Sequence, residues 1–132
     1  MNTRIYVSII VLLSLLVFTI QCEKKPMQPL KVDGNYSIDN DFLAGELTVK
    51  PLSNDKISFD VGTVTKHPGQ HSALIEGEAS IENKIATFQG EQGCKLTITF
   101  SPDQATITGA DNTCRYYMGA SAGVDGTYIR KK

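Results

Sequence analysis

The sequence predicts an all-β domain, an antiparallel barrel of about eight strands that is closed or nearly closed, with an open β-sandwich as the alternative. Short runs of alternating apolar and polar residues follow one another with no helical stretch between them. Turn-forming residues separate these runs. The same Asp-Gly turn opens the first run at 33–36 and the last at 125–128. Two strands entered in the same way at opposite ends of the chain could pair and remove the free edges of the sheet.

The 132 residues divide into a leader and one domain. Residues 1–21 have the layout of a signal peptide, with Arg4 in the positive end and an apolar run over 5–20. A transmembrane helix needs roughly 20 apolar residues, and this run is shorter. Residues 22–32 contain prolines and lysines without an apolar period, which is typical of a flexible tether. Residues 33–132 form the single β-domain.

The apolar run ends at Cys22, directly before three charged residues at 23–25. This arrangement resembles the bacterial lipoprotein signal, in which the cysteine receives lipid and becomes the mature amino terminus. Gln21 and Thr19 stand where that pattern has a small residue and usually leucine, so plain secretion and an uncleaved anchor remain alternatives. The resemblance implies a chain that is exported, carries fatty acyl groups such as palmitate on Cys22, and faces the periplasm or the cell surface from a membrane.

The expected strands share an apolar face and a polar face, with turn residues at each end. They are 35–38, 46–51, 56–61, 73–81, 86–88, 94–101, 105–108 and 126–130. A turn at Asn83-Lys84 would place Gly77 opposite Gly90, which indicates a tight bend or a place where another backbone passes closely. Only 39–44 could hold a short helical turn.

The central hairpin is the best-defined part of the chain. Its first strand alternates strictly from Cys94 to Ser101, and Pro102-Asp103 has the composition of a turn. With the turn centred there, Phe100 faces Ala105 and Ile98 faces Ile107, so the apolar faces coincide.

The two cysteines of the domain, Cys94 and Cys114, are expected to form a disulfide. The turn-rich segment 110–113 returns Cys114 toward the strand that begins at Cys94. An even number of cysteines behind an export signal indicates an oxidising compartment. The alternative is two free thiols in a cytosolic protein.

Composition restricts the classes of partner. The net charge of −1 indicates neither a nucleic-acid footprint nor a patch for anionic membranes. The charged fraction of 20% is ordinary for a folded soluble domain. We expect a monomer that binds no nucleic acid.

No catalytic or metal site can be assembled from the sequence, and we expect no enzyme activity and no cofactor. Residues 119–123 match G-x-S-x-G, the nucleophile elbow of α/β-hydrolases. That elbow requires a helix after the serine and a catalytic histidine later in the chain. Here both histidines precede Ser121 and no helix follows. His67 and His71 are separated by Pro-Gly and cannot share a helical face, and further zinc ligands are missing. Glu76 and Glu78 are adjacent outward positions on one strand, typical of a solvated face.

One aromatic concentration is a candidate contact surface. Tyr116, Tyr117 and Met118 precede a small-residue loop that contains Ser121. Tyrosine is favoured at recognition surfaces, which supports a binding role. Alternatively, one tyrosine faces the core and its neighbour the solvent, because adjacent residues of a strand point in opposite directions.

Several of these motifs together resemble a family of small, mostly uncharacterised exported bacterial β-domain lipoproteins, some of which occur beside lysozyme-inhibitor-type domains. The motifs are the alternating runs 77–81 and 86–88, the strand from Cys94, then Cys114 and the closing Asp-Gly-Thr-Tyr at 125–128. The resemblance implies a β-domain without catalytic activity that contacts a protein or glycan partner in the envelope or host, with lysozyme-type inhibition as its sharpest version.

The alternative function is a calycin-like carrier of a small hydrophobic ligand. An eight-stranded barrel can just hold one ligand, and the small residues Ala73, Gly77 and Ala79 could leave room for it. Whether the interior is filled or hollow separates the two functions.

Overall fold

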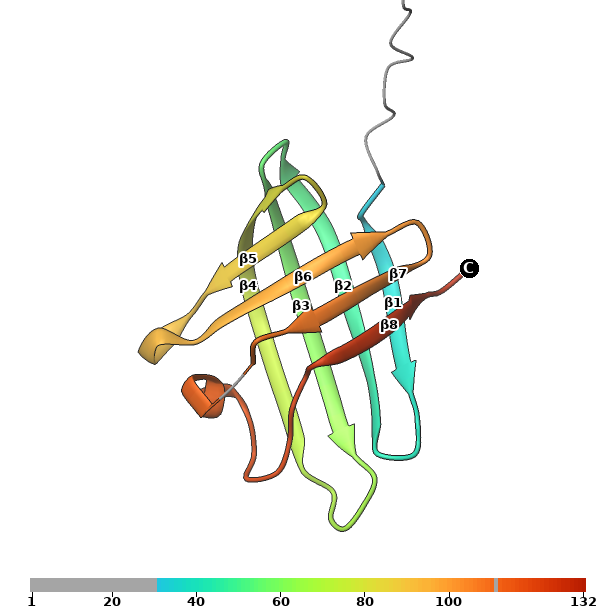
Figure 1. Ribbon diagram of the computed structural model, residues 1–132, viewed down its shortest axis with the longest axis vertical. Coiled ribbons are helices and arrows are strands. Elements are labelled where there is room, and N and C mark those ends of the chain that lie inside the picture. Colours follow the sequence, from blue (N-terminus) through green and yellow to red (C-terminus); the bar gives the residue numbers. More distant parts are fainter. Residues whose placement is uncertain (1–30, 111) are drawn as a thin grey trace, which may run out of the picture.

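The computed structural model describes residues 31–110 and 112–132, and these form the predicted closed antiparallel barrel of eight strands (Figure 1). The strands follow one another around the barrel in chain order, and β8 pairs back with β1. Their bounds are β1 Gly34–Asp39, β2 Leu43–Ser53, β3 Lys56–Thr65, β4 Ser72–Glu82, β5 Ile85–Gln89, β6 Lys95–Ser101, β7 Gln104–Thr108 and β8 Gly126–Arg130. Two short 3₁₀ helices, η1 (Glu91–Gly93) and η2 (Asn112–Tyr117), follow β5 and β7.

The signal peptide, Cys22 and nearly all of the tether lie outside the described residues. Within the described residues, no helix has the length and apolar character needed to cross a membrane.

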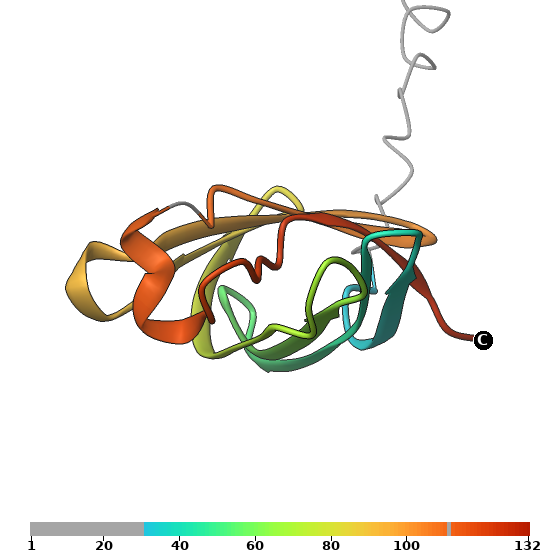
Figure 2. The ribbon, with the colours of Figure 1, turned by 90° about the horizontal axis from the view of Figure 1, so that it is seen from below.

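The barrel is flattened into two layers. Seen from below, β1 to β4 form one layer and β5 to β8 the other (Figure 2). β2, β3 and β4 have 10 or 11 residues each, whereas β5 and β7 have five. The layer of β1 to β4 therefore extends past the layer of β5 to β8. Loops that connect the strands cover the barrel where it does so.

Side chains fill the barrel interior. The inward positions of every strand contribute to one buried cluster. Its aromatic members pack edge-on or tilted: Phe59 and Phe88 have ring centroids 5.1 Å apart, and Tyr36 and Phe100 are 6.2 Å apart. The largest fully buried side chains are Tyr36, Tyr128, Leu47, Ile57, Ile75, Leu96, Ile98 and Ile107. These side chains occupy the interior in which a carried ligand would have to lie.

The expected pairing of Gly77 with Gly90 is wrong, because β4 and β5 part early. Their ladder has only the pairs from Glu82–Ile85 to Ser80–Thr87. The ring of Phe88 fills the space beyond: a Cβ on Gly77 would lie 2.7 Å from its Cε2, and one on Gly90 would lie 2.6 Å from its Cζ. Both positions lack a side chain because an aromatic ring, not a backbone, passes close to them.

Arg130 joins the seam between β8 and β1, where only two residue pairs are formed. Its guanidinium donates to the carbonyls of Lys31 (2.5 Å), Asp33 (2.7 Å) and Pro102 (3.1 Å). It also donates to the Tyr36 hydroxyl at 2.6 Å and lies 4.7 Å from the centre of that ring. Burial raises the pKa of the Tyr36 hydroxyl, and the Arg130 charge opposes this shift. One side chain thus holds residues 31–33, the β6–β7 turn and the seam together.

The central hairpin and the disulfide are confirmed. Phe100 pairs with Ala105 and Ile98 with Ile107. Cys94 and Cys114 are bonded, and both are fully buried. The sequence separation of 20 residues corresponds to about 3 kcal/mol of loop-closure entropy removed from the unfolded chain.

The local predictions differ from the structure in two places. Segment 39–44 holds no helical turn, because Leu43 already begins β2 and residues 40–42 form the hairpin turn. Tyr116 and Tyr117 belong to the 3₁₀ helix η2 and not to a strand, since the disulfide at Cys114 draws this segment across the end of the barrel. The alternation expected for a strand therefore does not set the directions of these tyrosines.

Candidate functional site

Connections between strands form one continuous surface, the loop end, which comprises the β1–β2 turn (40–42), the β3–β4 loop (66–71), the η1 segment (90–94) and the β7–β8 connection (109–125). Backbone hydrogen bonds link them. The Lys66 N–H donates to the Phe42 carbonyl at 2.9 Å, and the Gly119 N–H donates to the Ser72 carbonyl at 2.9 Å. The Glu91 N–H donates to the Tyr117 hydroxyl at 2.9 Å. The loops thus support one another.

The β1–β2 turn presents Phe42. The Asn40 carboxamide oxygen accepts hydrogen bonds from the backbone N–H of Phe42 at 2.9 Å and of Leu43 at 2.8 Å, which fixes the turn. The Phe42 side chain is 75% exposed. Phe42 is not among the candidates from the sequence, whose only expectation for 39–44 is a segment that could hold a short helical turn. An aromatic residue directly after Asn-Asp was the available signal.

The β3–β4 loop is closed by Thr65. Its hydroxyl donates to the Gly69 carbonyl at 2.7 Å and accepts from the His71 N–H at 2.9 Å. His67 and His71 both lie in this loop. In the part of the chain that the structure describes, no group of His, Cys, Asp and Glu side chains is arranged to hold a metal ion.

The helix η2 separates the two adjacent tyrosines. Tyr116 is 65% exposed, whereas Tyr117 is half-buried and packs edge-on against Phe88 at 6.2 Å. The two tyrosine rings are themselves 5.2 Å apart and nearly perpendicular. Tyr117, with its hydroxyl bonded to Glu91, is therefore an anchor that positions the exposed ring of Tyr116.

Met118 and Ser121 occupy different environments. Met118 is half-buried, packs against the core and bridges Ala73 of β4. Ser121 is exposed on the following loop. Arg115 closes that loop by donating to the Ala120 carbonyl at 2.6 Å. Of the candidate contact residues, Tyr116 and Ser121 face solvent, while Tyr117 and Met118 support them.

The loop is also fixed where it enters β8. The Thr63 hydroxyl donates to the Gly123 carbonyl at 2.7 Å, and the Tyr128 hydroxyl donates to the Val124 carbonyl at 2.7 Å. The Asp125 carboxylate accepts from the backbone N–H groups of 109 and 110 at 3.2 and 3.0 Å. Burial, with a smaller contribution from the Asp125 charge, raises the pKa of Tyr128 well above its usual range. Its hydroxyl remains a neutral donor at physiological pH.

The loop that carries Ser121 begins beside His71, at Gly119. A Cβ on Gly119 would lie 3.7 Å from the His71 Cβ. However, none of the hydrogen bonds among the described residues joins Ser121 to either histidine. A nucleophile–base pair is not assembled in this arrangement.

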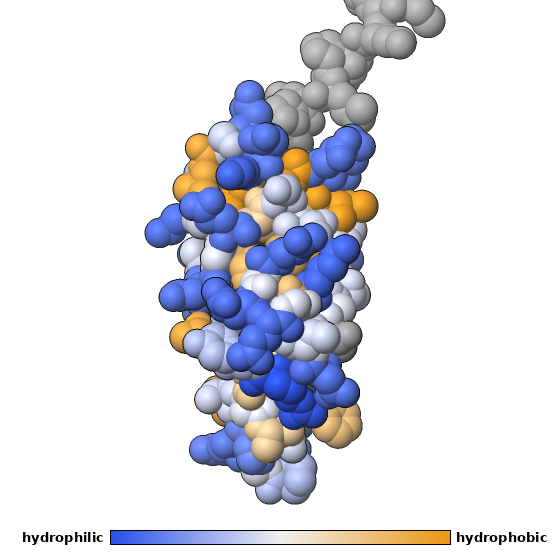
Figure 3. All heavy atoms as spheres, turned by 90° about the vertical axis from the view of Figure 1, so that its left-hand side faces the viewer, coloured by the Kyte–Doolittle hydropathy of each residue, from blue (hydrophilic) through white to orange (hydrophobic). Residues whose placement is uncertain are grey.

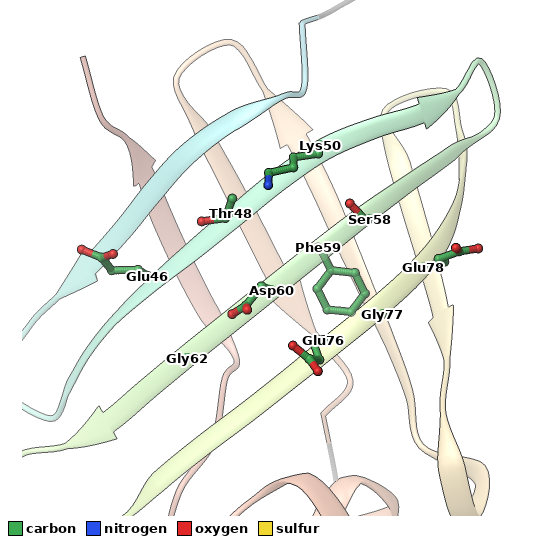
Figure 4. A pocket seen from close by; sticks show the side chains of 10 residues that line it. All are labelled: Glu46, Thr48, Lys50, Ser58, Phe59, Asp60, Gly62, Glu76, Gly77 and Glu78. Atoms are coloured by element: carbon green, nitrogen blue, oxygen red, sulfur yellow. The ribbon is translucent and has the colours of Figure 1, made fainter.

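A shallow groove runs over the outer face of β2, β3 and β4 (Figure 4). Asp60 lies directly opposite Glu76 in the β3–β4 ladder, and Ser58 lies opposite Glu78. Like charges in directly opposed positions are mildly destabilising. The residues that line the groove are Glu46, Thr48, Lys50, Ser58, Phe59, Asp60, Gly62, Glu76, Gly77 and Glu78. Glu76 and Glu78 are both exposed to solvent on β4, as the alternation predicts.

Comparison of the chain with protein-family models, with curated proteins and with solved structures finds no match.

Proposed function

We propose that this protein is a lipid-anchored binding module of the bacterial envelope, without catalytic activity, which contacts a protein or glycan partner through the loop end. The observation that carries this proposal is the exposed Tyr116, presented on a rigid support of the Cys94–Cys114 disulfide and the Tyr117 anchor. Loops on a rigid scaffold are a common location for binding residues. Exposed tyrosine supplies contact area at low entropic cost.

A second exposed aromatic ring supports the same surface. Phe42 lies on the β1–β2 turn, and Leu74 is exposed on β4 next to the bridge between Ala73 and Met118. Aromatic anchors surrounded by polar residues are typical of recognition surfaces. A contact surface of this kind needs a filled barrel as its support, and the core cluster provides one.

Photo-crosslinking in living cells tests the binding role directly. p-Benzoylphenylalanine at position 116 is expected to give a discrete crosslinked product. The same probe at position 52 is the control, because Leu52 is comparably exposed, at 52%, but lies at the other end of the barrel. Identical patterns at both positions, or no product at 116, would overturn the proposal.

Inhibition of a lysozyme is the sharpest version of the proposal. The purified chain is expected to inhibit a chicken-type or invertebrate-type lysozyme, and Tyr116→Ala is expected to weaken the inhibition about ten-fold or more while Leu52→Ala leaves it unchanged. The absence of inhibition at micromolar protein would eliminate this version. Mass spectrometry of the mature amino terminus tests the anchor separately, since an unmodified Cys22 is incompatible with it.

A further inference from the structure

The near-balanced net charge hides a separation of charge between the two ends of the barrel. Because successive strands are antiparallel, the turns 53–56, 82–85 and 101–104 lie at the same end as segments 31–34 and 130–132. We call this the tether end. Its cations are Lys31, Lys56, Lys84, Arg130, Lys131 and Lys132, and its acids are Asp33, Asp55, Glu82 and Asp103. Across the rest of the described domain the acids outnumber the cations: Asp39, Asp41, Glu46, Asp60, Glu76, Glu78, Glu91 and Asp125 stand against Lys50, Lys66, Lys95 and Arg115.

Arg130 concentrates lysines at the tether end. By binding the carbonyls of residues 31 and 33, it holds Lys31 beside the β8 terminus, where Lys131 and Lys132 follow. These residues line an open hollow of about 680 Å³ together with Asp33, Gly34, Asn35 and Pro102. The guanidinium itself is occupied by its carbonyl partners, so the accessible cations are the lysines.

The ion pairs of these lysines leave them available. Lys31 is 3.9 Å from the Asp33 carboxylate, and its side chain is 78% exposed. Lys131 pairs with Glu46, and their side chains are 43% and 72% exposed. Such pairs contribute little and are readily exchanged for other anions. Among the described ion pairs, none involves Lys132.

Exposed aliphatic side chains lie beside the lysines. Leu52, Ile85 and Ile129 are 52%, 45% and 54% exposed, and all are next to tether-end turns or termini. In Figure 3 hydrophobic areas stand out at the upper end of an otherwise mainly hydrophilic face. Lysines together with exposed aliphatic groups are the combination that binds the interface of an anionic bilayer.

We propose that the tether end is a lipid-facing surface, at which Lys31, Lys131 and Lys132 contact anionic phospholipid headgroups. This inference rests on the membrane anchorage in the proposed function. The lipid phosphates replace the weak carboxylate partners of the lysines, and the aliphatic groups enter the headgroup region. The acidic remainder of the domain is repelled by the same surface, so the loop end points away from the membrane.

Lysine footprinting of the full chain on vesicles tests this orientation. The chain is added to vesicles of equal parts phosphatidylglycerol and phosphatidylcholine, or of phosphatidylcholine alone, and acetylation rates are read by mass spectrometry. Acetylation of Lys31, Lys131 and Lys132 is expected to slow about five-fold or more on the anionic vesicles. The effect should largely disappear at about 0.5 M sodium chloride, where the Debye length is roughly 4 Å. Lys66 and Lys95, at the loop end, should react equally on both vesicles.

A matched pair of variants separates surface contact from general charge. Lys131→Glu with Lys132→Glu should abolish the protection of Lys31, whereas Lys95→Glu, at the loop end, should leave it intact. Circular dichroism of each variant verifies the fold. Equal acetylation rates on the two vesicles, equal slowing at Lys95, or no association with anionic vesicles would overturn the inference. Crosslinking at position 116 has its own readout, so failure of the binding role and failure of this surface are distinguishable.

Discussion

Replacing Gly77 with alanine should destabilise the barrel, although alanine is ordinarily the better residue in a strand. The added Cβ would lie 2.7 Å from the Phe88 Cε2. The ring has little freedom to withdraw, because Gly90 already lies against its opposite edge and Phe59 packs on it at 5.1 Å. The new methyl group therefore overpacks the core at the place where β4 and β5 separate.

The size of the effect follows from two opposing contributions. Overpacking a well-filled core by one methyl group costs about 1–3 kcal/mol. Replacing glycine with alanine recovers about 0.4–1 kcal/mol by restricting the unfolded chain. The net loss in unfolding free energy is then about 1–2 kcal/mol. For a domain of this size such a loss lowers the thermal midpoint by roughly 5–15 °C.

Urea unfolding monitored by circular dichroism measures this loss, with Gly62→Ala as the matched control. Gly62 lies on the neighbouring strand β3, and its nearest contact would be Leu74 Cδ1 at an ordinary 3.8 Å. That variant should be as stable as the parent or slightly more stable. In a Phe88→Leu background the cost of Gly77→Ala should fall by about 1 kcal/mol or more. If Gly77→Ala matches Gly62→Ala, or costs the same without the ring, Phe88 does not occupy this space.

The seam and the buried tyrosines give two further predictions. Arg130→Met should lower the unfolding free energy by about 2–4 kcal/mol because it removes several charge-assisted hydrogen bonds. The control Lys131→Met should change the unfolding free energy by less than about 1 kcal/mol. Equal thermal midpoints for the two variants would contradict the role given to Arg130. Burial raises the pKa of Tyr36 and Tyr128 in the folded state, while both titrate near pH 10 when unfolded. Their contribution to stability is therefore complete below about pH 10 and is lost as the pH rises toward the folded-state values. Alkaline titration of unfolding should show this decline, and Tyr128→Phe should reduce its slope; an unchanged slope would argue against a raised pKa at Tyr128.

Alternation and turn chemistry were sufficient for the strands and the central register. Each strand has one solvent-facing side and one buried side, so polar and apolar residues alternate with a period of two in the sequence. The Pro102-Asp103 turn fixes which residues oppose one another, and Phe100 does pair with Ala105. The disulfide follows from the same geometry, because the short return segment leaves Cys114 near the start of β6.

The features that were missed depend on groups far apart in the chain. The separation of β4 from β5 is set by the volume of Phe88 and by Tyr117 beyond it, which no local pattern encodes. The helix η2 is too short to show a helical period. Arg130 is an ordinary basic residue in the sequence, and its partners near the amino-terminal end of the domain are more than 90 residues away.

The two proposals assign different properties to the two ends of the barrel, and the filled interior connects these ends. In the proposed orientation the tether end would face lipid, and in the structure Arg130 joins the first and last strands at that end. In the proposed binding role the loop end would present Tyr116 to a partner, and the Cys94–Cys114 disulfide and the buried core support that end. β2 spans most of the distance between them: its 11 residues at about 3.3 Å each reach about 35 Å. A hollow barrel would have space for a ligand but would lose the packed side chains that support the loop end, where Tyr116 lies. Under the two proposals, the packed interior would therefore serve as the rigid spacer between the membrane and the partner.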